Sequence, residues 1–266
     1  MEIGARNLSV GYGGVPVLAG IDLTLRPGQL VGLIGPNGSG KTTLLRALAG
    51  LAPPLGGSIL YDGGRLPPRA LARRLAYLAQ GGEVNWALSV ENLVELGRLP
   101  HRSAFAGPGD ADRDAVARAL ALADAAHLRG RTVATLSGGE RARVLLARAL
   151  AVESETLLAD EPVATLDPLH QLATLALLRE GAGRGLGVVV VLHDLALAFR
   201  FCDRLILVAG GRIVGDGPPA AVLTDAVLAG AYRVRAARAS FEGEPILLPW
   251  RPVEPGRAGA PDHDER

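Results

Sequence analysis

The chain has 266 residues, of which 48% are hydrophobic, and its 28 basic and 27 acidic side chains leave a formal charge of +1. This size and hydrophobicity fit one large domain or a domain with subdomains, and the near-zero charge gives no sign of a nucleic-acid partner. The single cysteine, Cys202, excludes an intrachain disulfide and favours a reducing compartment. No apolar run reaches the length of a membrane span and the first residues lack a signal-peptide pattern, so work at a membrane would need a partner protein.

Two paired strands are expected first. Residues 2–10 and the alternating run from Ile21 to Arg26 have the pattern of half-buried strands. Tyr12 lies between them in a glycine-rich segment. Its ring could stack on a nucleotide base. The alternative is a packing tyrosine, which would be the simpler interpretation without the loop that follows.

The most informative stretch follows the apolar run from Leu30 to Ile34 and precedes the apolar-periodic run from Leu44 to Leu51. It matches G-x-x-x-x-G-K-[ST], a loop whose backbone N–H groups surround a phosphate between a strand and a helix. Glycines let the backbone close around the anion, and the helix N-terminus adds its dipole. The residues predicted to hold a nucleotide here are Gly35, Pro36, Asn37, Gly38, Ser39, Gly40, Lys41 and Thr42.

Within this loop, Lys41 is predicted to reach the outer phosphates and the Thr42 hydroxyl to hold Mg²⁺. Lys41 is the only lysine among the 28 basic residues of the chain. A compact ammonium fits inside a ring of backbone groups in a way that a planar guanidinium does not. The alternative, a chance glycine turn before a helix, is disfavoured by the unique lysine and by the strand and helix around the loop.

Polar residues end two further apolar strands. The run Leu75 to Ala79 ends at Gln80, and the run Thr156 to Ala159 ends at Asp160 and Glu161. Carboxyl ends of parallel strands face the ligand crevice, so Gln80 and Asp160 are predicted to serve Mg²⁺ and Glu161 to act as a base for the attacking water. The alternatives are an exposed loop glutamine and a helix-capping pair of carboxylates.

The run Gly187 to Leu192 is another central strand and ends at His193. A single histidine at a strand end is usually structural. Because His193 joins the other polar strand ends at one edge, we favour a phosphate contact.

The pattern changes to helix from Trp86 to about residue 153, which predicts a helical insertion with Ser89 as an N-cap and a helix over Asp110 to Leu128. The insertion carries Ser137, Gly138 and Gly139 at a helix start, a second anion site by the same physics. A hairpin around Gly210 and Gly211 and a short helix over 224–230 close a domain of residues 2–235. Residues 236–266 form a C-terminal extension whose end is expected to be flexible.

The motifs described above and their order along the chain resemble those of an ABC-transporter ATPase subunit, over roughly residues 2–235. The resemblance implies an α/β P-loop NTPase (RecA-like) core with an N-terminal antiparallel β subdomain and an inserted α-helical subdomain. It also implies that two copies of the chain enclose two ATP molecules. The motifs that carry it are Tyr12, the loop from Gly35 to Thr43, Gln80, the 136–140 segment, the 157–161 segment, Leu166 with Asp167, and His193.

The resemblance also implies roles for single residues. Tyr12 would stack on adenine, the loop through Thr43 would bind the phosphates, and Thr42 and Gln80 would ligate Mg²⁺ with Asp160 behind them. Glu161 would be the catalytic base, and His193 would touch the γ-phosphate. The residues expected to act between the two copies are Ser137, Gly138 and Gly139, which would reach the other copy's γ-phosphate, and Asp167, which would help to couple the two sites.

Two further segments, Trp86 to Val90 and Gly97 to His101, are similar to those of importers for iron–siderophore, haem and cobalamin. This similarity implies a peripheral location at the cytoplasmic face of the inner membrane. The implied partners are polytopic permease subunits, which Gln80 and the segment after it would face, and indirectly a substrate-binding protein. Ala164 and Thr165 replace the commoner Ser-Ala pair before Leu166, but no departure removes a group needed for hydrolysis.

Three rival functions stay open. The first is the ATPase of an exporter or of a transporter for another cargo. The second is a soluble cassette protein that acts on nucleic acid or ribosomes, although such proteins carry two cassettes or coiled-coil arms. The third is an unrelated phosphate-loop kinase or GTPase, which the Ser-Gly-Gly motif and the Asp-Glu pair disfavour.

Overall fold

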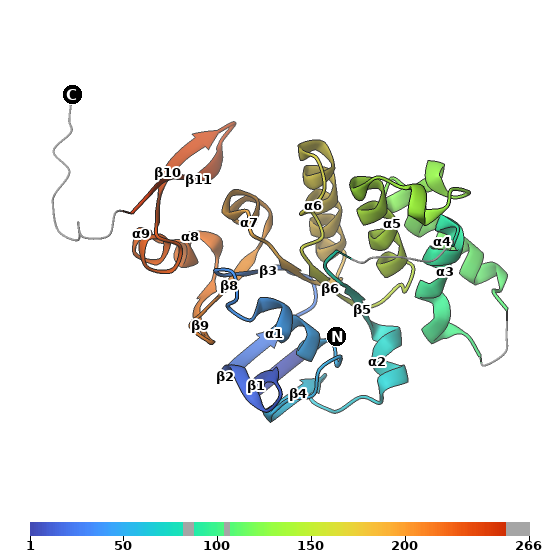
Figure 1. Ribbon diagram of the computed structural model, residues 1–266, viewed down its shortest axis with the longest axis horizontal. Coiled ribbons are helices and arrows are strands. Elements are labelled where there is room, and N and C mark those ends of the chain that lie inside the picture. The colour runs from blue at the N-terminus through green and yellow to red at the C-terminus, as the bar shows by residue number, and fades with distance from the viewer. Residues whose placement is uncertain (82–87, 104–106, 254–266) are drawn as a thin grey trace.

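The computed structural model describes residues 1–81, 88–103 and 107–253 and is built around a six-stranded sheet in the order β5-β6-β7-β3-β8-β9 (Figure 1). The first five of these strands run parallel to one another, and β9 is antiparallel to β8. The strands of the central sheet are β3 (Leu30–Ile34), β5 (Leu75–Leu78), β6 (Thr156–Asp160), β7 (Gly187–Val191), β8 (Arg204–Ala209) and β9 (Arg212–Gly217).

A second, antiparallel sheet has the order β2-β1-β4, from β1 (Ile3–Tyr12), β2 (Val15–Leu25) and β4 (Gly56–Tyr61). Ile3 is paired with Leu25 on one side and with Tyr61 on the other, which fixes the register. Helix α1 (Lys41–Leu48) packs between this sheet and the central sheet. The predicted α/β core with an N-terminal antiparallel β subdomain is therefore confirmed.

The central sheet has a hydrophobic core on each face because successive side chains of a strand point to opposite sides. In β7, Val188 and Val190 belong to one core, and Val189 and Val191 belong to the other. The second core contains α1 and the antiparallel sheet. Both faces of the central sheet are covered, and every residue of its parallel strands β3, β6 and β7 is buried, as expected of a parallel sheet with two covered faces.

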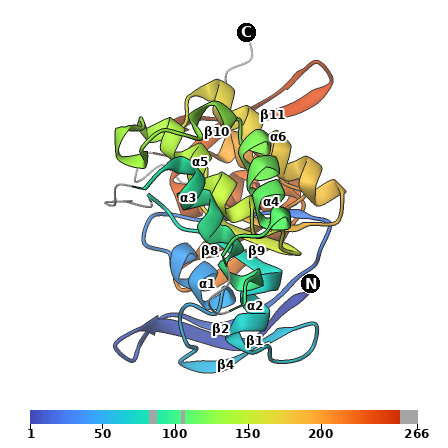
Figure 2. The same cartoon turned by 90° about the vertical axis from the view of Figure 1, so that its right-hand side faces the viewer.

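The other core includes the helices of the predicted insertion, which gather at one end of the molecule (Figures 1 and 2). Ser89 caps the first of them by accepting a hydrogen bond from the Asn92 N–H at 3.2 Å, as predicted. The helical segments here are α3 (Val90–Glu95), η1 (Leu96–His101), α4 (Asp110–Leu122), η2 (Ala126–Leu128), η3 (Val133–Thr135) and α5 (Gly138–Leu150).

The remaining helices connect or flank the strands. They are α2 (Pro68–Arg74), α6 (Pro168–Gly183), α7 (Leu195–Phe201), α8 (Pro219–Val222), α9 (Asp225–Val227) and η4 (Leu228–Tyr232). No helix within the described ranges is both long and apolar enough to cross a membrane.

Two helix predictions are wrong in extent. The helix predicted over Asp110 to Leu128 stops at Leu122, because Asp124 adopts a left-handed conformation (φ 49°) that cannot continue a helix. The single helix predicted over 224–230 is split into α9 and η4.

The sequence analysis missed a C-terminal hairpin of β10 (Val234–Phe241) and β11 (Glu244–Pro252). Its turn places Glu242 and Gly243 at positive φ, 53° and 82°, the combination that a tight two-residue hairpin turn requires. Leu247 is fully buried and anchors β11 beside α7. The expected start of the extension, residue 236, falls inside β10, while Trp86 and the expected flexible end lie outside the described residues.

Candidate nucleotide site

The loop between β3 and α1 has the backbone that its glycines predict. Gly35, Gly38 and Gly40 adopt φ values of 150°, 74° and 100°, which side-chain-bearing residues rarely reach. A Cβ on Gly35 would lie 2.1 Å from the carbonyl oxygen of Val208, so only glycine fits there. Gly40 is the N-cap of α1 and has no side chain to cap it. The first N–H groups of α1 therefore remain available to an anion.

Lys41 is folded back onto this loop. Its Nζ donates to the carbonyl oxygens of Gly35 at 2.8 Å and Pro36 at 3.0 Å, and only 6% of the residue is exposed. Burial lowers the pKa of Lys41, while the charges of Glu161 and Asp160 act in the opposite direction. The ammonium is thus held where a phosphate group inside the loop would meet it.

The structure gathers most of the predicted site residues around one cleft of about 810 Å³. Gln80, Glu161 and His193 line it at the carboxyl ends of β5, β6 and β7, as the strand-end prediction requires. The other lining residues are Tyr12, Val17, Asn37, Gly38, Ser39, Gly40, Lys41, Thr42 and Thr43. Gly35 and Pro36 form the start of the loop behind this surface.

Tyr12 stands at the rim of the cleft and is 57% exposed. Its hydroxyl lies 3.2 Å from Oγ1 of Thr43, which holds the ring beside the loop. The sequence analysis missed Val17, which also lines the cleft. The sequence predicts this strand from Ile21, whereas β2 begins at Val15. The alternating apolar residues Val15 and Val17 were the signal for the earlier start.

Asp160 sits at the end of β6 and is 1% exposed. Within the described residues, both of its carboxylate oxygens lack a hydrogen-bond partner. Burial raises the pKa of Asp160, the Thr42 hydroxyl opposes this effect, and the negative charge of Glu161 adds to it. A buried carboxylate without a partner is costly, so its environment suits a cation.

The donor set around Asp160 fits Mg²⁺. Hydroxyl, amide and carboxylate oxygens from Thr42, Gln80 and Asp160 are hard ligands, and Mg²⁺ takes few protein ligands together with phosphates and waters. No cluster of three or more His, Cys, Asp or Glu side chains that could bind a metal occurs in the described part of the chain. The residues present therefore suit a metal shared with a nucleotide rather than a protein-only cage.

Glu161 and His193 form a side-chain pair that the sequence did not reveal. Nε2 of His193 lies 2.5 Å from Oε1 of Glu161. Glu161 also adopts a left-handed backbone conformation with φ 52°, which is unfavourable for a residue with a side chain. This backbone turns the carboxylate from the strand end into the cleft, where it meets the histidine.

Ser137 and Gly138 do not line the loop cleft of their own chain, and neither does Gly139. Ser137 caps α5, because its hydroxyl accepts a hydrogen bond from the Glu140 N–H at 3.2 Å and its own N–H donates to Glu140 Oε2 at 2.8 Å. Gly138 lies in a smaller pocket next to Gln80 and Glu161. Ser137 and Gly138 are exposed, so the segment predicted as a second anion site faces outward from the chain.

Asp167 also lies away from the cleft and caps α6. Its Oδ1 accepts a hydrogen bond from the His170 N–H at 3.0 Å. This backbone hydrogen bond, together with the His170 ring, lowers the pKa of Asp167. The predicted coupling residue is thus an ionised cap on an exposed helix start.

The sequence matches the family described as "ABC transporter" over residues 18–164, which is more than half of the chain. A "Hemin import ATP-binding protein HmuV" from Pseudomonas aeruginosa is 46% identical over 252 residues, covering 91% of this chain and 97% of that protein. A "Cobalamin import ATP-binding protein BtuD" from Halobacterium salinarum is 43% identical over 241 residues, covering 89% of this chain and 60% of that protein.

Solved structures agree with these sequence relatives. "An inward-facing conformation of a putative metal-chelate type ABC transporter" has a chain that superposes with a TM-score of 0.81 at 26% identity, covering 93% of this chain and 97% of that chain. A dimeric bacterial ABC transporter cassette superposes with a TM-score of 0.73 at 27% identity, covering 82% of this chain and 99% of that chain. The chain therefore belongs to the ABC transporter family and is one of its ATP-binding ATPase subunits.

Proposed function

We propose that this chain hydrolyses ATP to drive import of haem through partner membrane subunits, and that cobalamin and ferric siderophores are the closest alternative cargoes. The observation that carries the proposal is the single cleft in which the phosphate loop meets the polar ends of β5, β6 and β7. The choice of haem is supported by relatives named as hemin import proteins that are 46% to 48% identical to the chain.

The roles of the cleft residues follow from their positions. The exposed ring of Tyr12 stacks on the flat face of the adenine base. Stacking of this kind needs only the π-face that every base has. The amides of the 35–43 loop and the ammonium of Lys41 bind the phosphates and neutralise the charge that develops as the outer phosphate leaves. His193 lies at the same edge and contacts the outer phosphate from the end of β7.

Thr42, Gln80 and Asp160 are the residues that would hold Mg²⁺. When bound, the ion neutralises phosphate charge and orients the outer phosphate. The support for this assignment is buried Asp160, whose two carboxylate oxygens have no hydrogen-bond partner among the residues that the structure describes.

Glu161 accepts a proton from the attacking water at its side-chain carboxylate. Its contact with His193 holds the carboxylate in one orientation at the mouth of the cleft. General-base catalysis of this kind contributes about 10²–10⁴-fold to a rate.

Ser137, Gly138 and Gly139 complete the site from a second copy of the chain. Ser137 and Gly138 are exposed, and none of the three residues lines the cleft of its own chain, which supports a contact between copies. Asp167 couples the two sites from the start of α6. Polytopic permease subunits hold this dimer at the cytoplasmic face of the inner membrane, and a substrate-binding protein delivers the cargo to them.

The test is to purify the chain with the permease that copurifies with it and the binding protein of that permease, and to reconstitute them in vesicles. ATP-dependent uptake and ATPase activity are then measured with the binding protein loaded in turn with haemin, cobalamin or a ferric siderophore. We expect haemin to stimulate both activities, and the same complex carrying Glu161→Gln to bind ATP without uptake.

Two results would overturn parts of the proposal. Stimulation by cobalamin or a siderophore alone would replace the cargo. ATP-driven movement of a compound out of the compartment that contains the ATPase would instead identify an exporter.

A further inference from the structure

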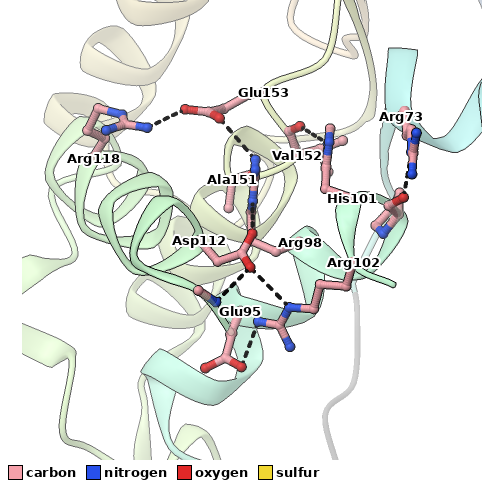
Figure 3. A network of polar contacts seen from close by, with 12 residues as sticks. Arg73, Glu95, Arg98, His101, Arg102, Asp112, Arg118, Ala151, Val152 and Glu153 are labelled. Carbon is pink, nitrogen blue, oxygen red and sulfur yellow. Dashed lines mark hydrogen bonds and ion pairs between the residues drawn. The ribbon is translucent and has the colours of Figure 1, made fainter. Parts of the chain in front are cut away.

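Arg98 and His101 of the segment Gly97–His101 lie at the carboxyl end of α5, beside Ala151 and Val152 (Figure 3). The amino end of the same helix carries Ser137–Gly139. This segment is similar to one in importers for iron–siderophore, haem and cobalamin, but its sequence alone indicates no role for it. In the structure it packs so closely on α5 that a Cβ on Gly97 would lie 2.3 Å from the carbonyl oxygen of Arg148. Glycine is therefore required for the two helices to meet.

Arg98 and His101 cap the end of α5. Nη1 of Arg98 donates to the carbonyl oxygen of Ala151 at 2.8 Å, and Nε2 of His101 lies 2.8 Å from the carbonyl oxygen of Val152. The last carbonyls of a helix have no partner within the helix, and a cation is favoured there by the helix dipole. This segment supplies both the donors and the positive charge.

The same guanidinium joins two other segments. Nε of Arg98 donates to Oδ1 of Asp112 in the first turn of α4, and Nη1 donates to Oε2 of Glu153 in the turn that leads into β6, both at 3.0 Å (Figure 3). Arg98 is only 7% exposed. A buried guanidinium with carboxylate and carbonyl partners in different directions fixes their relative positions more strictly than a lysine ammonium does.

An outer set of contacts holds this centre from two sides. Arg118 on α4 donates to the second oxygen of Glu153 at 2.7 Å. On the side of α2, Nε of Arg73 donates to the carbonyl oxygen of Pro100 at 2.7 Å. Arg98 is thus the only residue in Figure 3 that contacts α4, the end of α5 and the turn to β6 together.

We propose that Arg98 is a positioning residue that makes the amino end of α5, with Ser137–Gly139, and the carboxylates at the end of β6 move together. Residues 151–155 alone separate α5 from β6, and Arg98 contacts this connection at Ala151 and Glu153. Through it, contact of Ser137–Gly139 with the partner copy is linked to the placement of Asp160 and Glu161. The inference rests on the proposed ATP-dependent dimer.

The test uses Arg98→Lys, which keeps the charge beside Asp112 and Glu153. Its single nitrogen cannot replace both Nε, which faces Asp112, and Nη1, which faces Ala151 and Glu153. Two quantities are measured on the full chain: steady-state ATP hydrolysis, and ATP-dependent dimerisation in the Glu161→Gln background. We expect Arg98→Lys to lower kcat and dimer affinity by about tenfold each, the size of a typical coupling between sites. ATP affinity of the monomer should be unchanged, because the loop cleft is intact.

Two control variants separate positioning from stability, and a third variant removes a second contact to the same connection. Arg118→Gln removes a contact to the same Glu153 from an exposed position and should leave hydrolysis unchanged. Val116→Ala destabilises α4 from the buried side and serves as a control with a similar loss of Tm. His101→Ala removes the contact to the Val152 carbonyl oxygen and leaves Arg98 paired with its carboxylates. Like Arg98→Lys, it should lower kcat and dimer affinity.

The outcomes distinguish this inference from the proposed function. If the Glu161→Gln parent forms no dimer with ATP, the proposed function fails. If the Glu161→Gln parent dimerises and Arg98→Lys changes neither its dimer affinity nor the ATP hydrolysis of the otherwise wild-type chain, only the role of Arg98 fails. An equal loss in Val116→Ala would also overturn it, because instability would then account for the effect.

Discussion

Nε2 of His193 lies 2.5 Å from Oε1 of Glu161, so a side-chain contact joins the ends of the neighbouring parallel strands β7 and β6. The contact orients the carboxylate of Glu161 in the cleft. The adjacent carboxylate of Asp160 has no hydrogen-bond partner within the described residues. Two neighbouring acids thus occupy different environments, which suits one to proton transfer and the other to a cation.

Glu161→Gln should abolish most ATP turnover and leave ATP binding intact. The amide retains the size of the side chain but cannot accept the proton of the attacking water, so the expected loss in kcat is about 10²–10⁴-fold. The variant should accumulate as a dimer with ATP, measured by size-exclusion chromatography with light scattering. Turnover close to that of the parent would remove Glu161 from the role of base.

Lys41→Arg should weaken nucleotide binding although the charge is retained. The Lys41 ammonium fits between the carbonyl oxygens of Gly35 and Pro36, and a planar guanidinium at the same buried position would displace the loop. We expect at least about a tenfold loss in ATP affinity by calorimetry, equivalent to about 1.4 kcal/mol. Arg46→Lys, on the same helix, is the matched control. An unchanged affinity in Lys41→Arg would show that the identity of this cation is incidental.

Ser137→Ala should lose ATP hydrolysis while the isolated subunit still binds ATP. The structure adds a complication, because the Ser137 hydroxyl also caps α5 and its loss costs about 1 kcal/mol of stability. Ser137→Asp keeps a capping oxygen but brings a negative charge to the partner's phosphates. Both variants should therefore be inactive, although only Ser137→Ala should melt at a lower temperature. Loss of ATP binding by the monomer in either variant would contradict a contact between copies.

Asp160→Asn should stabilise the nucleotide-free chain and abolish the effect of Mg²⁺. Burial raises the pKa of Asp160 in the folded state, so its contribution to stability is largest at low pH and is lost as the pH rises through the folded pKa. A neutral amide avoids this cost at pH 8, and a gain of about 1 kcal/mol would raise Tm by about 2–4 °C.

Thermal scans at pH 5 and pH 8 check this expectation. The gap in Tm between Asp160→Asn and the parent should narrow at pH 5, where the parent carboxylate is closer to protonation. Mg²⁺ with ATP should raise the Tm of the parent more than ATP alone, and this difference should be absent in the variant. A variant less stable than the parent at pH 8 would refute the assigned cost of the buried carboxylate.

The part of the site that lies at strand ends could be predicted from sequence because parallel strands share one carboxyl edge. Gln80, Glu161 and His193 come from distant parts of the sequence and still meet at one cleft. The Glu161–His193 pair could not be predicted in the same way. It depends on the left-handed backbone at Glu161, and glutamate, unlike glycine, asparagine or aspartate, does not signal that conformation.

The β10–β11 hairpin shows why local patterns can also mislead. Pro245, Pro249 and Pro252 lie in β11, although proline cannot donate to a ladder and is therefore rare inside strands. In a two-stranded sheet each strand has a free edge, so proline is tolerated there. The Glu242–Gly243 turn was the available signal, but it stood in a segment rich in charge and proline.

The lone lysine has a practical consequence for biochemistry. A protease that cuts only after lysine has a single target bond in these 266 residues, between Lys41 and Thr42. That bond lies at the buried start of α1, so it is cut only when the phosphate loop opens. The yield of two fragments, near 41 and 225 residues, would therefore report the opening of the nucleotide site in an otherwise unlabelled protein.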